Sequence, residues 1–282
     1  MPIDAGQLQR QHVYERQAPL PAIQAEFAEI EALLNGVDAR RKTLRRIGLI
    51  ALLAGMACLI AGGVTGNAAA VIGVVLFIAG LVVLIAGFIV GGKLVNNRRK
   101  LPVLKELLST VADDAGARAP FSVRLTFWSK PKLVSEQSWT TRKHGKELFL
   151  ELPWIFVQGP LLDGCTVTHE ITEMMRKRTY TNPRGKRKVK TRSRYLVRLR
   201  FAYPSEIYGD ARQAQHALHE NVSLPRSAVI RDVRVTEKAI SMKAVAGLHD
   251  EIGRTARILS LGAYRLLNLN RRIAAGRSGG AQ

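Results

Sequence analysis

The sequence predicts an α-helical membrane hairpin of two transmembrane helices, followed by a cytosolic β-rich (α+β) domain of mainly antiparallel strands with a C-terminal amphipathic helix. An uncharged apolar run from Ile47 to Val90, interrupted only by Thr65, Gly66 and Asn67, predicts the hairpin. Later segments alternate apolar and polar residues, as half-buried strands do, and helical spacing takes over near the C-terminus. We expect five parts in order: a cytosolic arm with an amphipathic helix (1–46), the transmembrane hairpin (47–92), a helical connector (93–119), the basic β-rich domain with its C-terminal helix (120–275) and a disordered tail (276–282).

The chain carries a large excess of positive charge. Its 282 residues include 43 Lys and Arg against 22 Asp and Glu, a formal net charge of +21. Such a charge attracts lipid headgroups, nucleic acids and acidic proteins. The two cysteines, Cys58 and Cys165, do not make a disulfide framework, which agrees with a reducing compartment. The first twenty residues lack the apolar core of a cleavable signal peptide, so we expect the hairpin to direct the chain to the membrane.

The segment before the hairpin is predicted to be a loose arm and then a helix. Residues 1–20 show no periodicity, and Pro19 and Pro21 interrupt regular structure. Ile23, Phe27 and Ile30 then recur at helical spacing, with glutamates on the opposite face. A helix that lies on lipid normally carries Lys or Arg on its polar face, so we expect this one to pack on protein instead.

Two segments are long enough to cross a membrane. Ile47–Val64 has 18 residues and Ala68–Val90 has 23, against the roughly 17 to 25 that a transmembrane helix needs. Basic clusters flank the pair on both sides, and the loop between the segments carries no charge. By the positive-inside rule both termini are cytoplasmic, and we expect the protein in the inner membrane of a bacterium. The spans contain no Asp, Glu, Lys, Arg or His, which disfavours transport.

Glycines recur every seven residues within each predicted span, and seven residues make about two helical turns. Each series therefore forms one stripe, where two helix backbones can approach closely. We expect the stripes to pack the two spans against each other, with a homo-oligomer interface as the alternative. The stripes comprise Gly48, Gly55 and Gly62 in the first span and Gly73, Gly80 and Gly87 in the second.

The cytosolic part contains several predicted strands and helices. Leu101–Val111 has helical character and is expected to extend the second span. Alternation predicts strands at 121–127, 148–152, 229–235 and 239–245, with a turn near 142–145 and a short helix around 210–219. From Ile252 to Ile273, apolar residues lie on one helical face and arginines outside it, which predicts the closing basic helix.

The most informative stretch is a predicted basic β-hairpin, Gly164–Tyr203, with a turn at 182–186. Cys165, Val167 and Ile171 mark the inner face of its first strand, and alternate residues from Tyr195 to Tyr203 mark that of the second. Twelve basic residues and no acidic one lie between 176 and 200. They are the candidate anion-binding residues Arg176, Lys177, Arg178, Arg184, Lys186, Arg187, Lys188, Lys190, Arg192, Arg194, Arg198 and Arg200.

No catalytic, metal or cofactor motif is complete. His169-Glu170 begins like a zinc-protease motif, but Glu173 stands where the second His is required, so a polar pair on a strand surface is expected. Cys165 is expected to be a buried apolar cysteine. Phosphate-binding loops and nucleophile elbows are absent from the sequence, and the remaining histidines, His144, His216, His219 and His249, are dispersed. We predict no catalytic residue, metal or cofactor.

The leading functional hypothesis is a non-enzymatic, membrane-anchored scaffold whose basic hairpin binds anionic lipid headgroups or an acidic protein. A membrane-tethered nucleic-acid-binding protein is the alternative, and an enzyme with a site assembled from scattered residues is a third hypothesis. The layout resembles that of membrane-anchored bacterial proteins with pleckstrin-homology-like domains. This resemblance concerns architecture over most of the chain and implies no residue roles.

Overall fold

The structure is a computed structural model that describes residues 5–65, 67–139, 145–181, 184–214 and 222–278. The chain forms two compact units. The first comprises residues up to His12 together with Ala25–Arg98, and the second comprises Val13–Gln24 together with Arg99–Gln282.

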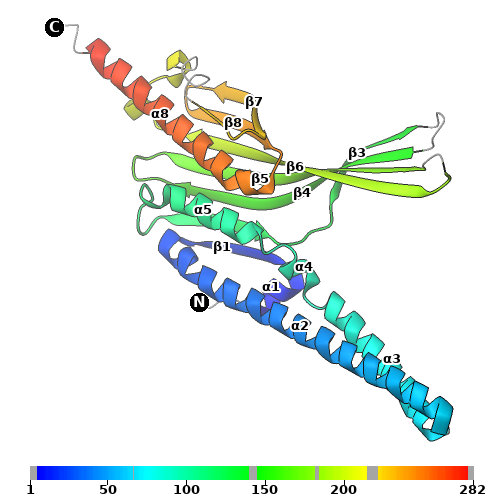
Figure 1. Ribbon diagram of the computed structural model, residues 1–282. Coiled ribbons are helices and arrows are strands. Elements are labelled where there is room, and N and C mark those ends of the chain that lie inside the picture. The colour runs from blue at the N-terminus through cyan, green and yellow to red at the C-terminus, as the bar shows by residue number, and fades with distance from the viewer. Residues whose placement is uncertain (1–4, 66, 140–144, 182–183, 215–221, 279–282) are drawn as a thin grey trace. The chain divides into compact units, whose positions relative to one another are not determined.

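The first unit is dominated by two long helices. It contains α1 (Ala5–Gln11), most of α2 (Leu20–Thr65), α3 (Asn67–Ile89) and the short α4 (Gly92–Val95). Both α2 and α3 include stretches long and apolar enough to span a membrane, and only 11% of each stretch is buried within the protein (Figure 1). Ile60 and Ile89 are 71% and 72% exposed. The expectation of two long apolar helices is therefore confirmed.

Arginines of α2 hydrogen-bond to the carbonyl groups at the end of α3. Nε of Arg41 and Nε of Arg45 donate to the carbonyl oxygen of Gly87 at 3.3 and 3.2 Å, and the Arg45 guanidinium lies 3.9 Å from the Phe88 ring centroid. The last carbonyl groups of a helix lack intrahelical partners and carry partial negative charge, so these cations stabilise the helix end. Gly91 follows with φ = 64°, a conformation that side chains disfavour, and the chain turns there.

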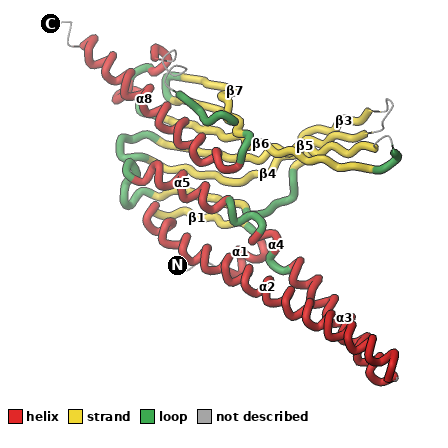
Figure 2. Tube along the Cα trace, in the orientation of Figure 1, coloured by secondary structure: helices red, strands yellow, loops and turns green. Residues whose placement is uncertain are grey.

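The second unit is built on one antiparallel sheet (Figure 2). The strand order is β1-β2-β4-β5-β6-β8-β7, and β3 pairs with another part of β4. The sheet therefore confirms the predicted β-rich class. The strands are β1 (Val13–Pro19), β2 (Pro120–Thr126), β3 (Lys132–Trp139), β4 (Gly145–Pro160), β5 (Thr166–Thr181), β6 (Arg187–Ala202), β7 (Ala228–Val235) and β8 (Ala239–Ala246).

Two helices pack on one face of this sheet, which becomes the core. In Figure 1, α5 (Lys100–Ala112) and α8 (Ile252–Ser278) lie on the same side of the strands, and they contact each other as well as the sheet. The sheet side chains that face them are fully buried, as the alternation predicts: they include Phe121, Val123, Leu125, Val167, Ile171, Val197 and Phe201. Short helical segments, α6 (Ser205–Tyr208), η1 (Ala211–Ala214) and η2 (His249–Glu251), complete the described part of the unit.

Four strands extend beyond the helices and form what we call the β-arm (Figure 1). The β-arm comprises β3 and the adjoining parts of its neighbours, residues 145–151, 174–181 and 187–194. At its base β4 has a bulge between Pro153 and Ile155, and the inserted Trp154 is 1% exposed. A bulge bends a strand and redirects a side chain, so it marks the transition from the core to the β-arm.

Several expectations from the sequence are wrong. The loose arm before Pro19 is partly β1, which pairs along its whole length with β2. The segment after the second span does not extend it, because residues 96–99 form turns and α5 then starts anew within the second unit. The strand β3 and the helix α6 were not expected at all. Positions 142–144 of an expected turn and 215–219 of an expected helix lie outside the described residues.

His169 also differs from expectation, because it is 1% exposed rather than on a strand surface. It faces α8, where its Nε2 atom lies 3.0 Å from the Ser260 hydroxyl oxygen. Glu170 is on the opposite face and pairs with Arg198. Cys165 is fully buried, as expected, and burial together with the nearby Asp163 carboxylate raises the pKa of its thiol to about 12. A thiol with such a high pKa is unreactive.

Candidate functional site

The candidate site is the basic face of the β-arm, which the strand register assembles in rows. Residues directly opposite each other on paired strands point to the same face. The register aligns Phe149 with Arg176 and Arg176 with Arg192. Six of the twelve predicted basic residues share this face: Arg176, Arg178, Lys188, Lys190, Arg192 and Arg194. The β-arm thus concentrates half of the predicted set on one surface.

Neighbouring strands contribute few acids to this face. The Arg176 guanidinium pairs with Glu147 of β4, and this hydrogen bond holds the pKa of the Glu147 carboxyl below its ordinary value. Within the described part of the chain, Arg192 and Arg194 form no ion pair. The sequence of β5 and β6 could not predict this ion pair, because Glu147 lies on a third strand, β4.

The alignment places like charges directly opposite each other. Arg176 faces Arg192, and in the next row toward the tip Arg178 faces Lys190. Like charges directly opposed across a sheet are destabilising. Folding alone does not favour two such rows in succession, whereas a bound anion would relieve the repulsion.

Aromatic rings accompany the basic residues near the tip of the β-arm. The Arg178 guanidinium lies 4.9 Å from the Trp139 ring centroid and 5.6 Å from that of Tyr180. The Lys190 ammonium lies 5.9 Å from the same Tyr180 ring. Distances below about 6 Å allow cation–π attraction, so the rings hold the cations in place without neutralising them.

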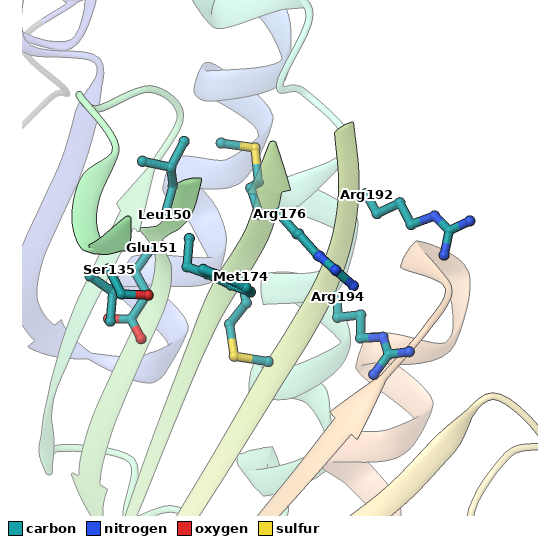
Figure 3. Close-up of a pocket in the computed structure, with 10 residues that line it drawn as sticks. Ser135, Leu150, Glu151, Met174, Arg176, Arg192 and Arg194 are labelled. Carbon is teal, nitrogen blue, oxygen red and sulfur yellow. The ribbon is translucent and has the colours of Figure 1, made fainter. Parts of the chain in front are cut away.

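The same face contains a pocket of about 440 Å³ with a largely apolar lining (Figure 3). Phe149 and Met174 are among its apolar residues, while Arg176, Arg192, Arg194 and Glu151 supply its charges. In Figure 3, Arg176 extends from β5 toward the strand that carries Arg192 and Arg194. A smaller pocket of about 130 Å³ lies beside it toward the tip and shares Arg176 and Arg192. Pockets of a few hundred Å³ are typical of small-ligand sites.

The other predicted basic residues lie elsewhere. Lys177 and Arg187 alternate with the six and point to the opposite face of the β-arm. Arg184 and Lys186 lie between β5 and β6. Arg198 and Arg200 are on the same face as the six but within the core part of the sheet, where Glu170 pairs with Arg198.

The six stripe glycines all lie where α2 and α3 meet. A Cβ atom on Gly48 would lie 2.6 Å from the backbone N of Leu84, and one on Gly55 would lie 2.5 Å from that of Phe77. One on Gly80 would lie 2.6 Å from the N of Leu52. Gly62 and Gly73 likewise have no room for a Cβ atom beside the facing helix, whereas one on Gly87 would make a tight contact of 3.0 Å with the backbone N of Arg45. At the other five glycines the backbones approach too closely for any larger residue.

A buried polar cluster lies at the base of the β-arm. The Lys100 ammonium donates to the carbonyl oxygens of Thr126 and Phe127 at 2.8 and 3.0 Å, and burial lowers its pKa to about 8 although the nearby Glu173 charge opposes this shift. The Trp154 indole N–H donates to Glu173 at 3.0 Å. These residues do not line the pockets described above. We infer that the cluster holds the bulge at Trp154 in place.

Three residues outside the predicted set make the basic face of the β-arm more than a charged strip. Phe149 and Met174 line the pocket, and Trp139 lies on the unexpected strand β3. The alternation in 148–152 indicates that Phe149 points to the other face of the strand from Leu148 and Leu150, but it does not show which strand lies beside Phe149. Among the described residues, no three His, Cys, Asp or Glu side chains gather as they would to bind a metal.

The sequence of the chain matches no protein-family model. Searches of curated proteins and of solved structures find no significant match either.

Proposed function

We propose that this protein is a non-enzymatic membrane-anchored scaffold whose β-arm binds the anionic surface of a lipid bilayer. The observation that carries the proposal is the set of six basic side chains on one face of the β-arm, with two directly opposed cation pairs and a single paired acid. Basic residues near an anionic membrane contribute about 1 kcal/mol each.

Insertion of α2 and α3 into a membrane is part of the proposal. The exposed apolar side chains of both helices would be unfavourable in water over such an area, whereas lipid solvates them. The basic residues that flank the pair then lie on the cytoplasmic side, which places both termini there. In a bacterium, this membrane is the inner membrane.

Lipid is favoured over the other anionic partners by the composition of the β-arm. Trp139 and Tyr180 lie among the cations, and aromatic rings with basic residues are typical of membrane interfaces. Val134, which lines the same pocket as Arg176 and Arg192, is more than half exposed, as suits a surface that meets lipid. A nucleic acid would bind mainly through contacts between its phosphates and basic side chains, and it would make no use of these apolar side chains. A nucleic acid and an acidic protein are the alternative partners.

The test uses the full chain held in nanodiscs of neutral lipid and measures its flotation with added vesicles. Wild type is expected to float with vesicles that contain phosphatidylglycerol and not with neutral vesicles, and added salt should weaken the binding. Replacing Arg178, Lys188 and Lys190 by Gln should weaken binding roughly 100-fold, from about 1 kcal/mol for each charge. The matched control replaces Arg254, Arg257 and Arg265 of α8, which are exposed and carry the same charge.

Three results would overturn the proposal. The first is equal flotation with neutral and anionic vesicles, and the second is an equal loss in the two triple variants. The third is a partner other than lipid without any binding to vesicles. That partner would be a DNA duplex bound in a salt-sensitive manner, or an acidic protein captured by cross-linking in intact membranes.

A further inference from the structure

We infer that the pocket beside Arg176, Arg192 and Arg194 binds a single anionic glycerophospholipid, with the headgroup phosphate against the arginines and the adjoining chain atoms on Phe149 and Met174. The inference deepens the proposed function, because it takes the β-arm as the part that meets lipid. It adds a discrete, saturable site to a surface that could otherwise bind lipid only diffusely.

The charges of the pocket fit a phosphate group. Guanidinium groups bind phosphate oxygens with paired hydrogen bonds, and two of the three arginines here have no acidic partner in the described chain. Arg176 and Arg192 are directly opposite, so one anion between them would neutralise the repulsion of that row. Packing of the strands by itself does not require two arginines to lie directly opposite each other in the pocket.

The count of charges favours a singly charged phosphodiester. The pocket residues Arg176, Arg192 and Arg194 carry three positive charges, while Glu151 carries one negative charge and Glu147 pairs with Arg176. The sum is one positive charge, which a phosphodiester balances. Glu151 is on β4, away from the arginines of β6, where it can accept a hydrogen bond from a headgroup hydroxyl. Phosphatidylglycerol has both groups.

The apolar lining distinguishes a lipid from a water-soluble phosphate. Phe149 and Met174 lie in adjacent rows on the same face as the arginines. A free phosphate ester would leave this lining exposed to water, whereas the glycerol and first acyl carbons of a lipid would cover it. The volume of about 440 Å³ suits the headgroup and the start of the chains but not a whole diacyl lipid.

The test counts lipid molecules bound to the full chain in detergent by native mass spectrometry. Phosphatidylglycerol is expected to give one saturable adduct that binds at least tenfold tighter than phosphatidylcholine or glycerol phosphate. Met174→Trp fills the pocket without changing charge, and it should remove this adduct. Arg192→Gln with Arg194→Gln should weaken it at least tenfold. Arg41 and Arg45 beside α3 also attract anionic lipid. The adduct of interest is therefore the one that is present in the wild type and absent from the pocket variants.

The control is Lys188→Gln with Lys190→Gln, which removes the same charge from the β-arm outside this pocket and should leave the adduct in place. Circular dichroism verifies that each variant folds. If the Met174→Trp variant does not fold, Met174→Phe is the milder substitution. An unchanged adduct in the folded pocket variants would overturn the inference, as would equal affinity for glycerol phosphate. Neither of these two outcomes changes the flotation of the protein with anionic vesicles, and the Met174→Trp variant should still float. Failure of the pocket site can therefore be distinguished from failure of the β-arm as a docking surface.

Discussion

His169 shows how a single buried side chain makes stability depend on pH. The Ser260 hydroxyl donates its hydrogen to the Ala256 carbonyl oxygen at 3.1 Å, so it accepts from the His169 Nε2–H at 3.0 Å. The other ring nitrogen, Nδ1, has no hydrogen-bond partner. The imidazole is therefore neutral, and burial lowers its pKa from 6.5 to about 4.

This lowered pKa predicts a loss of stability in acid. As the pH falls from about 6.5 to 4, the unfolded chain binds a proton at His169 and the folded chain does not, so the free energy of unfolding decreases. The loss should reach about 3 kcal/mol, since one pKa unit corresponds to about 1.4 kcal/mol. His169→Gln should lack this component. Thermal unfolding of both proteins in a non-ionic detergent gives the difference curve, and a flat difference between neutral pH and pH 4 would contradict the prediction.

Asp163 illustrates a second residue whose partners come from distant segments. Its carboxylate accepts hydrogen bonds from the Cys165 backbone N–H at 2.9 Å, from the Tyr208 hydroxyl at 2.6 Å and from the Tyr264 hydroxyl at 3.2 Å. Burial by itself would raise the pKa of Asp163, but these bonds outweigh it and lower the pKa. The carboxylate thereby connects the turn before β5 with α6 and α8.

The α2–α3 hairpin depends on backbone contact between its two helices. Gly55 faces the backbone of Phe77 and the carbonyl oxygen of Gly73, and neither can move aside as a flexible side chain could. The helices must separate to admit even one methyl group, and overpacking of this kind typically costs about 1–3 kcal/mol.

We therefore expect Gly55→Ala to destabilise the hairpin by about 1–3 kcal/mol. The matched control is Gly36→Ala in the same helix, where nothing lies within 4 Å of the added Cβ atom. Alanine is the better helix former, so that change should be neutral or stabilise by up to about 1 kcal/mol. Thermal unfolding in detergent compares the variants. Equal effects at the two positions would show that the close approach of α2 and α3 is unimportant.

The proposed membrane topology predicts a pattern of protease cleavage for the full chain. The sequence has no Lys or Arg between Arg46 and Lys93, so trypsin has no cleavage site in the apolar helices or in the loop that joins them. Trypsin added to the outside of spheroplasts should leave the chain intact. In inside-out vesicles it should digest the basic domain and leave a protected fragment that begins near Ile47 and ends near Lys93. Digestion of the domain in sealed spheroplasts would contradict cytoplasmic termini.

Elements whose signal is local were predictable. The long apolar helices follow from composition alone, because only length and the absence of charge are needed to identify them. The strands β2, β5, β6, β7 and β8 and the part of β4 at 148–152 follow from alternation, since burial of one sheet face imposes a period of two. The apolar face of α8 follows in the same way, and Ile252, Ala256 and Leu259 are fully buried there.

Elements that depend on a distant partner were not predictable. The segment that forms β1 has no alternation of its own and becomes a strand by pairing with β2, about a hundred residues later. The β3 segment is exposed along most of its length, so no buried face imposes a pattern on its sequence. His169 is different, because it lies two residues from both Val167 and Ile171, and the alternation that predicts their burial also indicates a buried His169 and an outward-facing Glu170.

Length, alternation and charge are local properties, and from them the sequence predicts the two long apolar helices, the β-rich part and the twelve basic residues between 176 and 200. Folding adds which of these cations share a face, the pairing of Glu147 with one of them, and the pocket that Phe149 and Met174 line beside them. These features are not local, because the neighbours across a sheet are set by strand pairing and register. Those depend on the packing of the whole domain and not on any one strand.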